Sequence, residues 1–442
     1  MHRGVPGRRK GTISLKRLFW GPLLLLGIGA GALDIDSGAY GDIADYLNGI
    51  YGADANAGLT AFPLLNIPIG GRAEGMAASF AAVADDASFL EFNPAGSSRL
   101  KRTELAFFHN NWIADTMIEG LVFTHRFGNL GLAAGGKWLY TPFTEYDRFG
   151  SRVSKGYYSE AEFILNGSYN FFSGYYFSGL SLGANLKGAL RLVPDYADKE
   201  SGELLGGSGR EQSAFAVMGD LGALTSFNLF KFYRSRERNA SAALVFRNLG
   251  PPSKGEALPT AAVLALAYKP VRPLLFSFDF FLPFNMRDPE LSERPYFAAA
   301  LAADITGFLS MRGGIQAKPG ALRLALGSAL RLGAGEAPRG ITLDLNYSLD
   351  MLSQIQPMNR LSLGFRIDLG DQGRAAKAAR VDELYLSGLE SYAGNDYPAA
   401  LLSWKEALEL DPKYVPAREA LSLLEESMAT GRRMDQMQQL DF

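Results

Sequence analysis

The sequence has no cysteine in its 442 residues. That absence excludes disulfides, thiolate metal sites, cysteine nucleophiles and an N-terminal cysteine that carries lipid. The three histidines, His2, His109 and His125, are too few and too scattered for a histidine metal cluster. The formal net charge is only -2, so the chain offers no broad basic field for nucleic acid. We therefore expect no metal, no cofactor and no nucleic-acid partner.

The sequence also lacks a hydrophobic run long enough for a transmembrane helix. The apolar run 18–32 is shorter than the roughly 20 residues that a spanning helix needs. Basic residues precede this run, and residues 30–32 (Ala-Gly-Ala) supply the small-x-small pattern of a cleavage site. We expect residues 1–32 to be a signal peptide, with the mature chain beginning near Leu33. The alternative is an N-terminal anchor that is retained.

The dominant pattern in the middle of the chain is alternation. In the segment 361–369 every second residue is apolar, and polar or small residues lie between them. Residues 341–350 repeat this pattern. A strand places successive side chains on opposite faces, so each segment has one apolar and one polar face. Both segments have the roughly nine residues that a tilted strand needs to cross a bilayer.

Similar but noisier alternation recurs in the segments 104–112, 118–127, 130–141, 158–172, 176–193, 213–225, 240–249, 260–269, 273–282, 295–305, 308–317 and 321–332. With the two clear segments, the pattern predicts an all-β transmembrane barrel of about fourteen antiparallel strands over residues 104–370. The alternative is a soluble β-sandwich, whose strands typically have about five or six residues.

The predicted connections alternate in length, as a membrane barrel requires. Those at 142–157, 194–212 and 283–294 are long and polar, whereas most on the opposite side are tight turns. Two connections break the rule, because 226–239 is long on the short side and 318–320 is short on the long side. An even number of strands predicts an outer-membrane protein with its N- and C-termini in the periplasm.

Residues 33–103, before the first predicted strand, lack alternation and contain turn signals such as Asn-Pro-Ala-Gly. They form either a strap outside the barrel or a hatch inside its lumen. The motif residues of this segment are Gly70, Gly71, Arg72, Gly75, Met76, Asp85, Asp86, Asn93, Pro94, Ala95 and Gly96.

These motifs resemble the opening of PorV/PorQ-type outer-membrane barrels, and residues 104–115 resemble the first strand and loop of their spirochaete relatives. Those relatives are distantly similar to FadL, the long-chain fatty-acid channel. The resemblance covers roughly 57–370 and implies a fourteen-stranded barrel with an N-terminal hatch, through which hydrophobic molecules pass. It implies a structural turn at the triplet 93–95. No residue match identifies a fatty-acid pocket.

After residue 370 the alternation gives way to helical periodicity. We expect a linker at 371–380 and an all-α unit at 381–430, which resembles one tetratricopeptide repeat. The residues that match the repeat signature are Gly388, Ala400, Trp404, Ala407 and Pro412. The usual aromatic between the first two small positions is displaced, because Ser391 occupies that place. One repeat cannot bury its own face, so it either packs on the barrel rim or recruits a partner.

The leading functional hypothesis is a channel for hydrophobic small molecules, in which substrate is captured at the outer rim and the hatch moves. Its partners would be outer-membrane lipid and fatty acids or other hydrophobic ligands. Asp344, Arg366 and Asp368 would face the lumen and hold the hatch, although for any single one of them ordinary lumen polarity is the favoured explanation.

The second hypothesis is a PorV-like scaffold for protein secretion or surface attachment, in which the repeat docks a periplasmic protein partner. An enzyme is the third. Its only conceivable acid/base set is Asp85 and Asp86 with His109, and nothing pairs that set with a nucleophile. The aspartate doublet fits better as a turn cap or as a partner of Arg72. We therefore predict that the protein is not an enzyme.

Overall fold

The computed structural model describes residues 49, 52, 54–112, 115–146, 149–194, 212–333, 340–351 and 358–440. The predicted signal peptide and the predicted mature N-terminus lie outside these residues. Among the described helices, none is long and apolar enough to cross a membrane.

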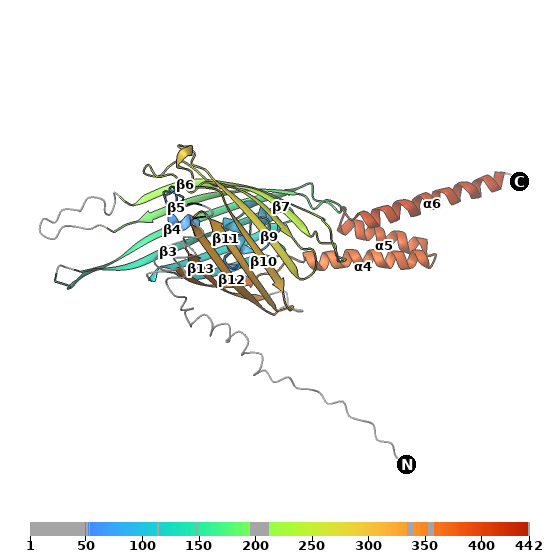
Figure 1. The fold of residues 1–442 in the computed structure, drawn as a ribbon. Helices are drawn as coiled ribbons and strands as arrows, with labels where there is room; N and C mark the ends of the chain where they lie inside the picture. The colour runs from blue at the N-terminus through green and yellow to red at the C-terminus, as the bar shows by residue number, and fades with distance from the viewer. Residues whose placement is uncertain are drawn as a thin grey trace, which may run out of the picture.

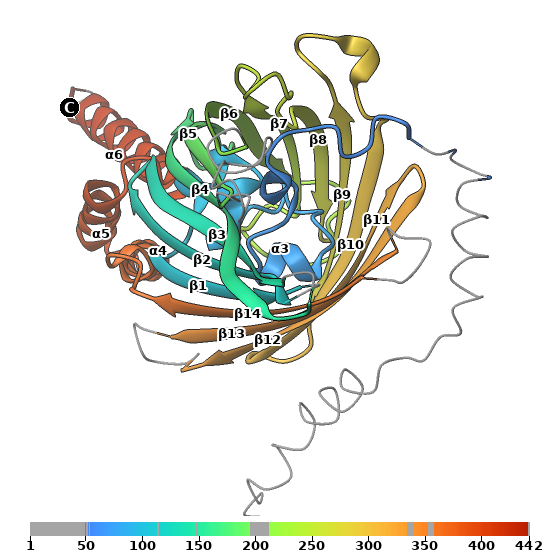
Figure 2. The ribbon, with the colours of Figure 1, turned by 90° about the vertical axis from the view of Figure 1, so that its left-hand side faces the viewer.

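Fourteen antiparallel strands form a closed barrel in the described part of the chain, because β1 pairs with β14 as well as with β2 (Figures 1 and 2). This confirms the predicted fold class. The strands are β1 (Glu104–Asn111), β2 (Met117–Phe127), β3 (Leu130–Tyr146), β4 (Arg152–Phe171), β5 (Leu180–Leu192), β6 (Ala214–Phe227), β7 (Ala240–Leu249), β8 (Ala261–Tyr268), β9 (Leu274–Pro283), β10 (Tyr296–Asp304), β11 (Leu309–Lys318), β12 (Ala321–Leu332), β13 (Ile341–Met351) and β14 (Met358–Asp368).

The two ends of the barrel differ. We call the end with the connections 193–213, 250–260 and 284–295 the loop end, and the end that leads into the C-terminal helices the turn end (Figure 1). The predicted loop 142–157 is wrong over most of its length, because β3 and β4 extend into it and leave only 147–151 as the connection. Aromatic and β-branched residues, which favour strands, continue on both sides of that connection.

The barrel is apolar outside and polar inside. Phe163, Leu165 and Leu326 on its outer surface are each more than 60% exposed. Lys187 and Asp279, which point inward, are buried. This arrangement is the reverse of a water-soluble β-barrel and matches a wall that faces acyl chains.

Of the two alternatives for the segment before β1, the structure has the hatch. Residues 61–103, here called the plug, lie inside the lumen and form four short helices instead of strands (Figure 2). These are η2 (Pro63–Asn66), α3 (Gly71–Gly75), η3 (Ala87–Glu91) and η4 (Pro94–Arg99).

The plug crosses the lumen from one end to the other. Just before it, the Asn56 side chain donates hydrogen bonds of 2.9 Å to the carbonyl oxygens of Glu290 and Ser292 at the loop end. Thr103, the last plug residue, lies at the turn end, where its N–H donates to the Gly370 carbonyl oxygen over 2.9 Å. The N-terminus is outside the described residues, but residue 54 and the C-terminal helices lie at opposite ends of the barrel.

Three helices follow β14, namely α4 (Arg374–Ala393), α5 (Tyr397–Leu410) and α6 (Val415–Leu440). The predicted linker 371–380 is therefore mostly helical, because α4 begins at Arg374. Alanines favour this early start, and the Asp371 carboxylate accepts a hydrogen bond of 2.7 Å from the Ala375 N–H. At the other end, α6 extends ten residues beyond the predicted limit of 430.

Small residues let α4 and α5 approach closely. Gly388 faces the Trp404 indole, and Ala400 and Ala407 are completely buried beside it. Of the residues that match the repeat signature, only Pro412 lies outside a helix, between α5 and α6. These three helices form a small unit with its own apolar core.

The helical unit packs on the rim of the barrel. Arg236 of the long connection 228–239 forms an ion pair with Asp382 of α4 and donates a hydrogen bond of 3.1 Å to the Tyr414 hydroxyl. Burial, and then the hydrogen bond to Asp382, raises the pKa of Tyr414 to about 12. Lys413 donates to the Ser173 carbonyl oxygen over 2.7 Å. The connection that broke the predicted alternation of lengths is thus a docking element.

We expect Gly388→Ala to destabilise the helical unit by about 1–3 kcal/mol, because the added methyl group would lie 2.2 Å from the Trp404 Nε1 atom. The control is Gly431→Ala in α6, which meets nothing within 4 Å and should stabilise its helix slightly. Thermal unfolding of the full-length protein, followed by helical circular dichroism, measures both. Equal unfolding temperatures would contradict the close packing of α4 on α5.

Candidate functional site

Three buried ion pairs bind the plug to the barrel wall, and all three have the same arrangement of charges. In each pair the plug supplies the carboxylate and the wall supplies the cation. Glu74 pairs with Arg360 at 2.7 Å, and Asp86 pairs with Arg366 at 2.7 Å. The third pair joins Glu91 to Lys137. Arg360 and Arg366 lie near opposite ends of β14, and Lys137 lies on β3, which is separated from β14 by β1 and β2. The three pairs therefore fix the plug against one part of the wall, at different levels along it.

The pair between Glu74 and Arg360 is the most deeply buried. The side chains of both residues are at most 1% exposed. One oxygen of Glu74 accepts hydrogen bonds from Arg360 Nε at 3.0 Å and Nη2 at 2.7 Å, and from the Ser348 hydroxyl at 2.8 Å. Desolvated charges are stable only when they are paired and hydrogen-bonded, so each partner requires the other.

Two of the three predicted lumen charges belong to this network. Arg366 reaches both Asp86 of the plug and Asp344 of β13, with the latter contact at 3.1 Å. Asp344 also accepts a hydrogen bond of 2.7 Å from Arg312. Asp368 lies at the turn end instead, where it pairs with Arg102 next to the end of the plug.

A second network of alternating charges lies under the other side of the plug. Lys137 contacts the plug twice, through Glu91 and through a hydrogen bond of 2.6 Å to the Ile67 carbonyl oxygen. Glu162 lies 3.2 Å from Lys137 and 2.8 Å from Lys187. The sequence analysis missed these residues. Their position on the polar face of β3, β4 and β5 was the available signal.

Uncharged wall side chains satisfy the irregular backbone of the plug. Three wall carboxylates do so as well. Asp279 accepts hydrogen bonds from the N–H groups of Phe80 and Ala81 at 3.0 and 2.8 Å. Glu160 of β4 accepts one from the Leu64 N–H at 2.9 Å, and Glu104 of β1 accepts one from the Ala87 N–H at 2.8 Å. Other contacts of this kind come from Asn110 to the Ile69 carbonyl, Asn166 to the Pro94 carbonyl, Asn185 to the Leu90 carbonyl, and Ser168 to the Ser98 N–H. A plug without regular strands can therefore be buried, because its polar groups have partners.

The first motif group of the plug forms α3 and its contacts. Gly70 and Gly71 both have a positive φ, and a Cβ atom at Gly71 would lie 2.6 Å from the Phe108 ring. Arg72 pairs with Asp85 at 2.7 Å. Gly75 packs against the Arg312 side chain, and Met76 is completely buried.

The second motif group makes turns and touches the wall. Asn93 caps η4 by accepting a hydrogen bond of 3.0 Å from the Ala95 N–H, and its amide donates to the Ala81 carbonyl oxygen at 2.8 Å. Pro94, Ala95 and Gly96 continue η4 and are buried. Asp86 caps η3 through the Ser88 N–H at 2.9 Å.

The structure does not bring His109 to the aspartate doublet. His109 lies on the outward face of β1 and pairs with Glu119 on β2 at 2.9 Å. Asp85 and Asp86 lie inside, where each pairs with an arginine. Among the described residues, no group of three or more His, Asp or Glu side chains is arranged to hold a metal ion.

Glycines in the wall leave room for the backbone of the plug, and they were not predicted from the sequence. A Cβ atom at Gly131 of β3 would lie 2.1 Å from the Ser97 carbonyl carbon. A Cβ atom at Gly183 of β5 would lie 2.2 Å from the Pro94 carbonyl oxygen. The backbone of η4 therefore runs directly against the backbone of the wall.

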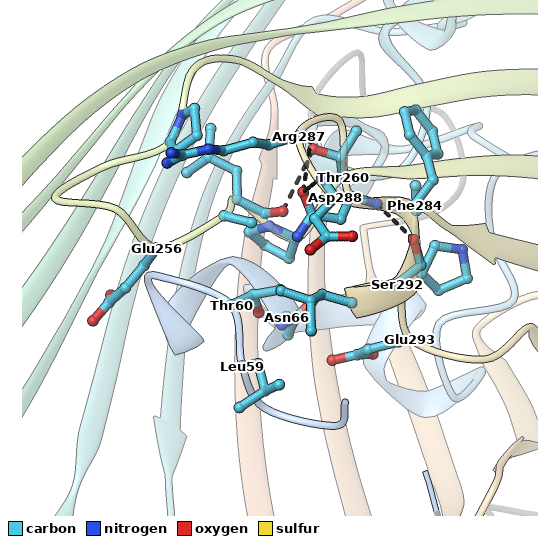
Figure 3. Close-up of a pocket in the computed structure, with 18 of the residues that line it drawn as sticks. Leu59, Thr60, Asn66, Glu256, Thr260, Phe284, Arg287, Asp288, Ser292 and Glu293 are labelled. Atoms are coloured by element: carbon cyan, nitrogen blue, oxygen red, sulfur yellow. Dashed lines mark hydrogen bonds between the residues drawn. The ribbon is translucent and has the colours of Figure 1, made fainter. Parts of the chain in front are cut away.

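A cavity of about 530 Å³ lies at the loop end, beside the first part of the plug (Figure 3). Three segments line it, namely the plug segment with its approach, the connection 250–260, and the connection 284–295. The lining is mixed, with apolar Leu59, Leu258, Phe284, Leu291 and Tyr296 and with charged Glu256, Arg287, Asp288 and Glu293.

The wall next to this cavity is irregular. The ladder between β6 and β7 ends at the pair Gly219–Leu249, whereas β6 starts five residues earlier, at Ala214. The connection 250–260 lies along this part of β6, and the Ser253 hydroxyl donates to the Phe215 carbonyl oxygen over 3.2 Å. A loop therefore replaces a strand in this section of the wall.

A family model described as "Uncharacterised protein family (UPF0164)" matches residues 49–372. The chain belongs to this family. A UPF0164 protein of Treponema pallidum (strain Nichols) is 31% identical over 373 residues, which are 80% of each chain. A second one is 26% identical over 385 residues, which are 81% of this chain and 74% of its own. The match to the UPF0164 model contains the plug and the barrel and ends before α4.

Solved barrels are also similar to this UPF0164 member. The toluene transporter TbuX of Ralstonia pickettii has a TM-score of 0.39 at 11% identity, covering 70% of this chain and 98% of its own. A deltaS2S3 mutant of TodX, a monoaromatic hydrocarbon channel, has a TM-score of 0.38 at 12% identity, covering 64% and 93%. These superpositions are loose, so they assign no substrate to the chain.

We expect Arg360→Met to destabilise the protein by about 3–5 kcal/mol, because it leaves the buried Glu74 carboxylate without its cation. The double variant Glu74→Gln/Arg360→Met should recover most of that loss. The temperature at which the barrel loses its faster migration on unheated gels gives the comparison.

The control is Asp304→Asn, which breaks an exposed pair with Arg331 and should change the stability by at most about 1 kcal/mol. If the double variant lost as much stability as Arg360→Met, the unpaired Glu74 carboxylate would not be the cause of the destabilisation.

Proposed function

We propose that this protein is an outer-membrane channel that transports hydrophobic small molecules, such as long-chain fatty acids, and that its plug is the gate. The supporting observation is the plug itself, which fills the lumen of an outwardly apolar barrel, with a cavity beside it at the loop end. No chemical step is needed. The predicted signal peptide would direct the chain out of the cytoplasm.

The route begins at the cavity of the loop end. Its apolar side chains offer a first binding place, and the start of the plug, with Leu59 and Thr60 just before it and Asn66 within it, forms one of its walls. Straight passage along the lumen would meet the buried ion pairs. A hydrophobic molecule would instead leave sideways where the connection 250–260 replaces the β7 ladder, once the plug segment shifts.

The proposed orientation puts the loop end outside the cell and the turn end in the periplasm. Outer-membrane barrels have short periplasmic turns and long outer loops. Three of the long connections, 193–213, 250–260 and 284–295, lie at the loop end, whereas the long 228–239 at the turn end and the short 319–320 at the loop end are exceptions. The helical unit would then lie in the periplasm.

A PorV-like scaffold, with a tetratricopeptide-like unit that docks a periplasmic protein, is the second candidate. It is favoured by exposed apolar side chains on the helical unit, since Leu386, Leu402 and Leu423 are each more than half exposed. A single repeat leaves such a face without a neighbour.

A disulfide that locks the plug tests the transport proposal cleanly, because the chain has no native cysteine. The hydroxyl oxygens of Ser97 in the plug and Ser168 in β4 lie 2.6 Å apart. In the double variant Ser97→Cys/Ser168→Cys, oxidation should stop the uptake of a radiolabelled long-chain fatty acid into outer-membrane vesicles. A reductant should restore it.

The matched control joins two residues outside the plug. The Thr116 and Thr141 hydroxyl oxygens lie 2.9 Å apart, so Thr116→Cys/Thr141→Cys should form a disulfide without changing uptake. Undiminished uptake with an oxidised Ser97–Ser168 pair would contradict the plug as gate. No uptake in any variant, together with a protein captured by the helical unit of the full-length chain, would favour the scaffold.

A further inference from the structure

The connection 228–239 lies on the outside of the barrel rim at the turn end. The Tyr268 side chain belongs to the outward face of β8, and its hydroxyl donates a hydrogen bond of 2.9 Å to the Phe230 carbonyl oxygen. The Phe232 N–H donates to the Pro270 carbonyl oxygen over 3.3 Å. Both contacts hold this part of the connection against the outer surface of the wall instead of across the lumen.

Two phenylalanines of this connection are among the most exposed apolar side chains of the protein. Phe230 is 75% exposed and Phe232 is 73% exposed. They continue the apolar outer surface of β8, which exposes Leu264 and Leu266. Aromatic side chains at the edge of such a surface are typical of the level at which lipid head groups begin.

Two basic side chains lie beside the neighbouring Tyr233 ring. The Arg272 guanidinium lies 5.3 Å from the centre of the Tyr233 ring, and the Lys231 ammonium lies 5.2 Å from the same ring. Arg234 is exposed one residue further along. The only acidic residue of the connection, Glu237, already pairs with Lys101 of the plug.

The protein balances the positive charge of this surface only in part, because Glu237 is the one carboxylate of the connection and interacts with Lys101, Lys269 and Arg272 together. Arg236 pairs with Asp382 of α4, and Arg238 donates a hydrogen bond to the Tyr175 carbonyl oxygen in the connection between β4 and β5. Within the described residues, neither Arg234 nor Arg272 has an ion-pair partner. Two guanidinium groups beside exposed rings therefore face the level of the head groups.

We propose that the rim patch, formed by Phe230, Phe232, Tyr233, Arg234 and Arg272, binds an anionic phospholipid of the leaflet at the turn end. The two arginines bind the head-group phosphate, to which a planar guanidinium donates paired hydrogen bonds. The phenylalanines contact the first part of the acyl chains. A zwitterionic lipid brings a head-group cation that the two arginines repel, whereas an anionic lipid brings none, so the patch selects lipids with a net negative charge. This inference rests on the membrane location in the proposed function, but not on transport.

Native mass spectrometry of the full-length protein released from nanodiscs tests the proposal. The nanodiscs contain equal amounts of phosphatidylglycerol and phosphatidylcholine. Wild-type protein should retain phosphatidylglycerol in preference, and Arg234→Gln/Arg272→Gln should lower that preference by roughly five-fold for each arginine, the effect of one basic residue near an anionic surface.

The matched control is Arg287→Gln/Arg331→Gln, which removes the same charge from exposed positions outside the rim patch and should keep the preference. Phe230→Ser/Phe232→Ser should reduce the retention of both lipids and leave their ratio unchanged. Equal retention of the two lipids by wild type, or an equal loss in the control, would overturn the rim patch while leaving the plug-lock result untouched. A protein that enters no nanodisc would overturn the membrane location together with it.

Discussion

The rest of the structure depends on pairing between carboxylates of the plug and cations of the wall. The lumen of this barrel is too wide for its own side chains to fill, so a separate segment fills it. That segment has little regular secondary structure, so burying it requires a hydrogen-bond partner for each of its backbone N–H and C=O groups. Glu74, Asp86 and Glu91 meet Arg360, Arg366 and Lys137, and side chains such as Asp279 bind the backbone between them. The barrel and the plug therefore each need the other's charges.

The same pairing suits a gate. A buried ion pair contributes little net stability compared with apolar packing, because desolvation offsets much of its Coulomb energy, but breaking it by removing one partner is costly. Buried ion pairs therefore add little to the strength with which the plug is held. They do specify one position of the plug, because any other position would leave buried charges unpaired. Backbone contact at Gly131 and Gly183 specifies the same position of the plug sterically, since only glycine leaves room for η4 at both places.

The turn end joins three functions in one connection. Residues 228–239 hold the helical unit through Arg236, contact the end of the plug through Glu237, and present Phe230 with Arg234 on the lipid side. The sequence already showed the segment 226–239 as a long exception on the side of the short turns. The connection is long because it serves contacts on three sides, which no two-residue turn could reach.

The sequence by itself determined the barrel, because a period of two leaves one apolar face on every strand, and the alternating segments are long enough to cross a bilayer whereas the strands of a sandwich are typically shorter. It also indicated the plug motifs and the small residues between α4 and α5, since glycine permits backbone conformations and close approaches that other residues do not, and proline fixes φ. It did not reveal that Lys137, Glu162 and Lys187 form one network. Their positions along the strands indicate that they point inward, but they do not indicate which opposite charge each one contacts. Only the tertiary structure, in which the curvature of the wall and the path of the plug set those distances, decided which partners pair. The start of α4 at Arg374 was missed for a local reason, the Asp371 cap, which periodicity does not register.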